Sequence, residues 1–109
     1  MESEIKYIGI DSLDEIEASE LKSLVERNMP KVERHLSKHQ KETTSAKTRV
    51  SVKKVNHGDK KKHFLIKMYV ASTVGKFEVE HSDWDLARTV HKVFESMTNI
   101  LKKDLKLKE

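Results

Sequence analysis

The sequence contains no cysteine, one proline and three glycines among its 109 residues. Without cysteine the chain can form no disulfide framework, thiolate nucleophile or zinc ribbon, and a reducing, cytoplasmic setting is the expected one. The glycines are too scattered for a glycine-rich phosphate loop. No apolar run approaches the roughly 20 residues of a membrane span. The opening residues, Met-Glu-Ser-Glu, are not those of a secretory signal, so we expect no membrane association.

Charge is abundant and unevenly divided. Charged residues make up 37% of the chain, which has a net charge of +4. Residues 1–20 hold seven acids and one base, a net charge of −6, whereas residues 21–109 hold 21 bases and 11 acids, a net charge of +10. A basic body of this kind favours a polyanionic partner.

Hydrophobic periodicity predicts six elements. Alternating apolar residues predict strands, and spacings of three and four predict amphipathic helices. The strands are expected at 4–10, 47–55, 63–71 and 76–81, and the helices at 19–39 and from about 83 to 103. The last three strands are joined by short turns and should form an antiparallel meander. Residues 1–109 are then a single α+β domain with an ordered core over about 4–103 and a basic tail at 104–109.

The order β-α-β-β-β-α indicates a two-layer architecture, because two amphipathic helices need an apolar surface to cover. We therefore expect a four-stranded sheet with both helices packed on one face. Ser19 is the expected cap of the first helix, and Lys22 three residues later leaves it without a capping box. Pro30 predicts a kink or a break in that helix. Ser82 and Asp83 are the expected caps of the second helix.

Basic residues recur at helical spacing. In the first helix they form one line of like charges, a pattern that costs a few tenths of a kcal/mol per pair and favours an anion placed along it. The second helix repeats the pattern less completely, and a lysine-rich hairpin follows the second strand. The residues are Arg27, Lys31, Arg34, Lys38 and Lys41 in the first helix, Arg88, Lys92, Lys103 and Lys106 in the second, and Lys53, Lys54, Lys60, Lys61 and Lys62 in the hairpin.

Catalytic and metal-binding patterns are weak. His35 and His39 are four residues apart, but the glutamate of a His-Glu-x-x-His motif is missing, so surface histidines are the simpler interpretation. Glu78 and Glu80 alternate with core residues and should face solvent. No serine lies in a nucleophile-elbow context. We expect a non-enzymatic protein without metal, cofactor or small-molecule substrate.

Both helices resemble those of a known family. The run Leu21-Lys22-Ser-Leu24-Val25-Glu-Arg-Asn-Met29-Pro-Lys31-Val32-Glu33-Arg34-His-Leu36 is similar to the first helix of the ribosome hibernation-promoting factors, also called protein Y or the sigma-54 modulation protein family. Asp85-Leu86-Ala-Arg-Thr-Val90 resembles the start of their second helix, and Gly9 lies where they place a glycine. The chain differs at Asn28, Pro30 and Ala87-Arg88-Thr89, and its acidic 11–17 segment replaces a family turn.

The resemblance implies a short-type factor that binds the small ribosomal subunit and its 16S-type RNA, and inhibits translation in stress or stationary phase. Lys22, Lys31 and Arg34 match basic positions of the family's first helix, and Lys102 and Lys103 fall in its basic helix end. The charge pattern alone adds four further candidates for RNA binding, namely Arg27, Lys38, Arg88 and Lys92.

Two other functions stay open. The α-β-β-β-α portion is laid out like a double-stranded-RNA-binding domain, although the acidic start of the second helix lacks the usual lysines. Alternatively, Trp84 and the outward-facing Leu65 and Tyr69 form an apolar patch for protein interaction or dimerisation, unless Trp84 covers the helix–sheet junction. We expect a monomer or a weak dimer.

Overall fold

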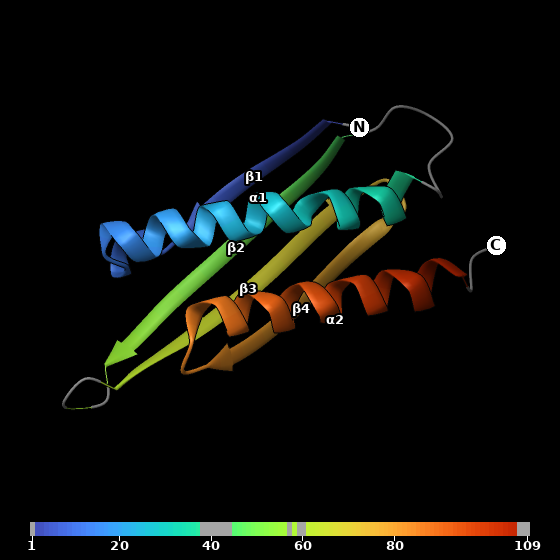
Figure 1. The fold of residues 1–109 in the computed structure, drawn as a ribbon. Helices are drawn as coiled ribbons and strands as arrows, with labels where there is room; N and C mark the ends of the chain where they lie inside the picture. The colour runs from blue at the N-terminus through green and yellow to red at the C-terminus, as the bar shows by residue number, and fades with distance from the viewer. Residues whose placement is uncertain (1, 38–44, 57, 59–60, 107–109) are drawn as a thin grey trace.

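The computed structural model describes residues 2–37, 45–56, 58 and 61–106 (Figure 1). Their order confirms the predicted β-α-β-β-β-α architecture, with a short 3-10 turn added after the first strand. The elements are β1 (Glu2–Ile8), η1 (Ile10–Ser12), α1 (Glu15–Ser37), β2 (Ser45–Asn56), β3 (Lys62–Ser72), β4 (Gly75–Asp83) and α2 (Leu86–Lys106).

The sheet is mixed, with strand order β1-β2-β3-β4. β2, β3 and β4 form the predicted antiparallel meander, and β1 pairs in parallel with β2 at the edge. Both helices lie on one face of the sheet, as predicted (Figure 1). Because β4 runs in the direction of β2, the two helices are parallel to each other and begin at the same end of the molecule.

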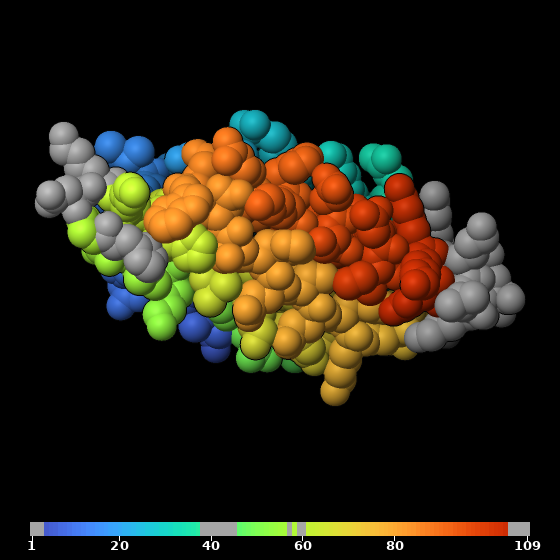
Figure 2. Space-filling model, turned by 90° about the horizontal axis from the view of Figure 1, so that it is seen from below, coloured from blue at the N-terminus to red at the C-terminus, as the bar shows by residue number. Residues whose placement is uncertain are grey.

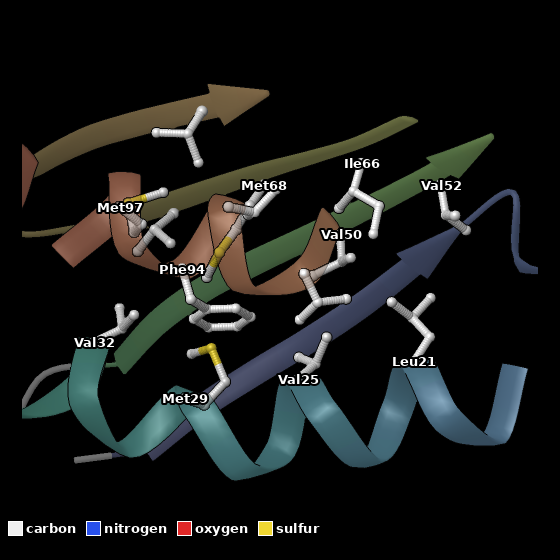
Figure 3. Packing of buried hydrophobic residues seen from close by; sticks show 14 of the residues in the cluster. Leu21, Val25, Met29, Val32, Val50, Val52, Ile66, Met68, Phe94 and Met97 are labelled. Atoms are coloured by element: carbon white, nitrogen blue, oxygen red, sulfur yellow. The ribbon is translucent and has the colours of Figure 1, made fainter. Parts of the chain in front are cut away.

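The core fills the space between the helices and the sheet. The apolar stripes of both helices and of β2, β3 and β4 are buried, apart from Leu24 of α1, which is half-buried. The edge strand β1 contributes less, since Ile5 and Tyr7 are half-buried and Ile8 is exposed. Figure 3 shows Leu21, Val25 and Met29 of α1 pointing toward the strands, with Phe94 of α2 next to Met29. Within residues 2–37, 45–56, 58 and 61–106, no helix lies on the other face of the sheet.

Both helices begin at residues other than the predicted caps. Asp14, not Ser19, caps α1: its carboxylate accepts the backbone N–H of Glu17 at 2.7 Å, and the Glu17 carboxylate accepts the N–H of Asp14 at 3.1 Å. This is a reciprocal capping box, so the prediction that the helix has none was wrong. Asp85, rather than Ser82 or Asp83, caps α2 by accepting the N–H of Arg88 at 2.8 Å.

Pro30 does not break α1, which continues as one helix to Ser37. The proline is exposed on the side away from the core. The Glu26 carbonyl that loses its partner there can be hydrated, whereas the same loss on the buried side would leave an unpaired polar group. The apolar contacts of Met29 and Val32 hold the helix on the sheet on both sides of the proline.

Gly9 is required by the bend between β1 and η1. Its φ is +77°, and a Cβ atom at this position would lie 2.3 Å from the backbone oxygen of Val52. Any L-residue would therefore have both an unfavourable backbone conformation and a clash with β2.

The molecule is elongated, with extents of 51 × 23 × 18 Å. Figure 2 shows α2, in orange and red, lying along β4 in gold. Trp84 lies at the corner between these two elements. Its ring packs 4.9 Å from that of His63, yet 57% of the residue is exposed, so it covers little of the core.

Candidate nucleic-acid interface

Three bases of α1 share its solvent side. Arg27, Lys31 and Arg34 are all exposed, and their i, i+4 and i+7 spacing places them along about 10 Å of one helix face. Within the part of the chain that the structure describes, none of them forms an ion pair. We call these three residues the α1 basic stripe. Lys38 and Lys41, which would extend it, lie outside the described residues.

Lys22 is exposed but does not belong to the α1 basic stripe. Its ammonium group lies 5.9 Å from the centre of the Tyr7 ring on β1, within the range of a cation–π interaction. Burial, followed by the charge of Glu26, raises the pKa of Tyr7 above its usual value. Lys22 therefore lies over the β1 edge, on a different side of α1 from Lys31.

Two of the predicted RNA-binding residues of α2 are held by an acid. The ammonium group of Lys92 lies 2.6 Å from the Asp83 carboxylate, and the guanidinium of Arg88 lies 3.4 Å from it. The carboxylate also accepts the backbone N–H groups of Trp84 and Asp85. The Lys92 hydrogen bond, supported by these backbone donors, lowers the pKa of Asp83 to about 2. The single charge of Asp83 thus offsets one of the two positive charges of Arg88 and Lys92, chiefly that of Lys92, which lies closer to it.

Lys102 and Lys103 are exposed near the end of α2 and, among the described residues, have no ion-pair partner. Because the helices are parallel, this end of α2 lies at the same end of the molecule as the end of α1 (Figure 1), whose last turn contains Arg34. Consecutive helical residues point about 100° apart, so Lys102 and Lys103 cannot both extend the same charged surface.

The hairpin lysines are partly used to hold the fold together. Lys54 lies 2.6 Å from the Glu17 carboxylate and Lys62 lies 3.7 Å from it. The Glu17 hydrogen bond raises the pKa of Lys54, and the backbone N–H of Glu17 lowers that of Asp14. The acidic start of the chain therefore neutralises part of the basic hairpin and caps α1.

The uncovered face of the sheet carries a second set of bases that the prediction of site residues left out. Lys6 of β1 and Lys47, Arg49 and Lys53 of β2 are exposed. The Arg49 guanidinium lies 5.1 Å from the centre of the Tyr69 ring on β3. The sequence signal for this surface was the placement of Lys47, Arg49 and Lys53 at odd positions of β2, because alternate strand residues share one face.

The structure offers little for other chemistry. Among the described residues, no three histidine or acidic side chains lie close enough together to bind a metal ion. None of the helices described is both long and apolar enough to cross a membrane. The patch proposed for protein interaction is interrupted, since exposed Lys67 lies between Leu65 and Tyr69 on the outer face of β3.

Comparison with known proteins identifies the fold. No protein-family profile and no curated protein sequence matches the chain. Among solved structures, the N-terminal domain of protein Y from Thermus thermophilus aligns over 94% of this chain and 98% of its own, with a TM-score of 0.54 and 19% identity. A ribosomal subunit interface protein from Coxiella burnetii aligns over 94% of this chain and 96% of its own, with a TM-score of 0.48 and 15% identity. The chain has the fold of the protein Y N-terminal domain, the fold that its sequence resemblance implied.

Proposed function

We propose that this protein is a non-enzymatic factor that binds RNA of the small ribosomal subunit through the α1 basic stripe and thereby inhibits translation in stress or stationary phase. The observation that carries the proposal is that Arg27, Lys31 and Arg34 follow one another on an exposed helix face and have no acidic partner among the described residues. Such a line of charges repels itself in the free protein and is stabilised by a phosphate backbone.

The packing of α1 on the sheet holds the α1 basic stripe in a fixed position. Leu21, Val25, Met29, Val32 and Leu36 are buried on the opposite side of the same helix, so the stripe is presented by a rigid element. Ordering the helix costs nothing further on binding, which favours affinity.

The ribosome is chosen as partner because of the helix patterns shared with the hibernation-promoting factors. The fold expected from those patterns is the one found, with the whole domain aligned to protein Y. A factor of this kind would act in the cytoplasm, where it would occupy RNA without a cofactor or a chemical step.

Charge reversal tests the proposal. K31E/R34E should lower association with purified small subunits at least about 100-fold in sedimentation at 0.15 M salt, because repulsion replaces attraction at two adjacent positions. K61E/K76E is the matched control, since it changes the net charge equally at exposed positions away from α1. Its association should stay within about threefold of the parent's. If K31E/R34E sediments with small subunits as the parent does, the proposal is wrong.

Double-stranded RNA is the second candidate partner. From α1 to α2 the chain retains an antiparallel three-stranded meander with two helices on one face, which is the layout of a double-stranded-RNA-binding domain. A 16-base-pair RNA duplex is the discriminating competitor. It should release small subunits only at large excess if the ribosome is the partner, and at stoichiometric amounts if duplex RNA is.

A further inference from the structure

Among the described residues, no helix covers the face of the sheet turned away from α1 and α2 (Figure 1). Alternate residues of each strand point to it, because side chains alternate across a strand. Its members are Glu4, Lys6 and Ile8 of β1, Lys47, Arg49, Ser51 and Lys53 of β2, Leu65, Lys67, Tyr69 and Ala71 of β3, and Lys76, Glu78, Glu80 and Ser82 of β4. We call this the open sheet face.

Positive charge is concentrated on one half of the open sheet face. β1 and β2 contribute four bases and the single acid Glu4, and no ion pair shorter than 4.0 Å involves any of these five among the described residues. On the other half, Lys67 is paired with Glu78 at 3.5 Å and Glu80 adds a second acid. The half formed by β1 and β2 therefore attracts anions, while the half formed by β3 and β4 is close to neutral.

Strand register brings the bases together with an aromatic ring. Lys6, Arg49 and Tyr69 are directly opposite one another on three adjacent strands. Like charges on neighbouring strands are destabilising, so Lys6 and Arg49 favour an anion between them. Lys6, Lys47, Arg49 and Tyr69 line a shallow hollow of 440 Å³.

The Arg49–Tyr69 pair supplies flat surfaces for a nucleobase. Its guanidinium and ring are 5.1 Å apart, and both groups are on the open side of the sheet. RNA-binding proteins hold unpaired bases by stacking on aromatic rings and on guanidinium planes. A duplex would keep its bases stacked inside and could not use such a site.

The spacing of the lysines fits a nucleic-acid strand. Lys47 and Arg49 are two residues apart on β2, or about 6.8 Å along the strand axis, and Lys53 lies two such steps beyond Arg49. Such a row of charges can follow successive phosphates of one extended strand. Adjacent sheet strands are about 4.8 Å apart, which places Lys6 beside the same row.

We propose that the half of the open sheet face formed by β1 and β2, together with Tyr69, binds single-stranded RNA, with one base on the Arg49–Tyr69 pair and the phosphates along Lys6, Lys47 and Lys53. This surface lies on the opposite side of the sheet from the α1 basic stripe. It does not require the ribosome to be the partner of α1, although a domain with both surfaces can contact two RNA segments at once.

Direct binding of a fluorescent 12-nucleotide single-stranded RNA to the purified full chain tests the proposal. K47E/R49E should weaken binding at least tenfold at 0.1 M salt. The slope of the logarithm of the binding constant against the logarithm of salt concentration should also become shallower by about 1.4, the value for two phosphates on a single strand. K61E/K76E is the matched control, because it changes the net charge equally at exposed positions outside both proposed binding surfaces, and its binding should stay within about threefold of the parent's. Tyr69→Leu should weaken binding about fivefold or more through lost stacking.

The proposal is overturned if K47E/R49E binds the RNA like the parent, or if K61E/K76E weakens binding as much, which would indicate a non-specific effect of net charge. It is also overturned if a 12-residue polyglutamate competes as well as unlabelled RNA, because an acidic protein segment would then be the better occupant. Far-UV circular dichroism checks folding, and K47Q/R49Q replaces the reversal variant if that one unfolds. Small-subunit sedimentation of K31E/R34E is scored separately, so either proposal can fail alone.

Discussion

The two helices carry similar rows of basic residues but use them differently. On α1, Arg27, Lys31 and Arg34 have no acidic partner among the described residues, whereas on α2 Arg88 and Lys92 turn back to Asp83. The difference comes from the sheet, because β4 ends in a carboxylate beside α2. Spacing along a helix therefore indicates where bases lie but not whether they are available to a ligand.

The largest expected effect is the difference in small-subunit affinity between alanine variants of the α1 bases and alanine variants of the α2 bases. K31A/R34A should weaken small-subunit binding about 20-fold, and the log–log salt slope should flatten by about 1.8 for two lost phosphate contacts. R88A/K92A should weaken binding only about threefold, since Asp83 already offsets one of its two charges, but should lower the midpoint of thermal unfolding by leaving Asp83 without its cations. Sedimentation at three salt concentrations and thermal melts measure both. Equal losses of affinity would contradict the comparison.

Asp83→Asn should leave the bases of α2 without their acidic partner, so that they become available to a ligand as those of α1 are. The amide keeps an oxygen for the backbone N–H groups of Trp84 and Asp85 but frees the charges of Arg88 and Lys92. Small-subunit affinity should rise by about threefold at 0.05 M salt and less at 0.2 M, because long-range attraction is screened. Asp104→Asn, at an exposed acid further along α2, is the control for the change in net charge alone.

The same variant should alter the pH dependence of stability. Asp83 has a pKa of about 2 in the folded protein and 3.8 without its partners, so the unfolded chain takes up its proton first as the pH falls. Its contribution is complete above about pH 5 and is lost progressively down to about pH 2. Urea unfolding between these values should show a shallower acid loss for Asp83→Asn. Parallel curves for the two proteins would refute the Asp83–Lys92 coupling.

The sequence was sufficient for the order of the elements, for the antiparallel meander and for most of the core, because these depend on periodicity. The stripe of Val25, Met29 and Val32 needs only the 3.6-residue repeat, and the meander needs only alternation and short turns. The capping box of Asp14 and Glu17 was also readable as an Asp-x-x-Glu pattern, but a helix start placed at Ser19 hid it.

Contacts between residues far apart in the sequence could not be predicted from hydrophobic periodicity. Glu17 and Lys54 are 37 residues apart, and their contact exists only because α1 begins above the end of β2. Asp83 was predicted to be a helix cap from its position in the sequence. Its contact with Lys92 exists only because of the turn between β4 and α2. The parallel pairing of β1 at the sheet edge likewise depends on a crossover that local pattern does not specify.

The two helices also differ in how their N-terminal caps are built, and this difference has a smaller expected effect. α1 begins with a reciprocal box, whereas α2 begins with the one-way acceptor Asp85. Asp85→Ala should lower the free energy of unfolding by about 1 kcal/mol, because one N–H of the first turn loses its acceptor. Asp85→Asn retains an acceptor and should be near the parent. The midpoint of urea unfolding should shift without a change in m-value, and equal stability of the two variants would show that the cap contributes nothing.

Lys22 should give the smallest effect and so tests the geometry of α1 most closely. The family resemblance groups it with Lys31 and Arg34, but the structure places its ammonium over Tyr7. Five residues separate it from Arg27, which turns it by about 140° around the helix axis. Lys22→Ala should therefore change small-subunit affinity less than about twofold, against about fivefold for Lys31→Ala, with a stability cost of about 0.5 kcal/mol from the lost cation–π contact. A loss equal to that of Lys31→Ala would mean that RNA reaches around α1 to the β1 edge, and the binding surface would then include that side of the helix.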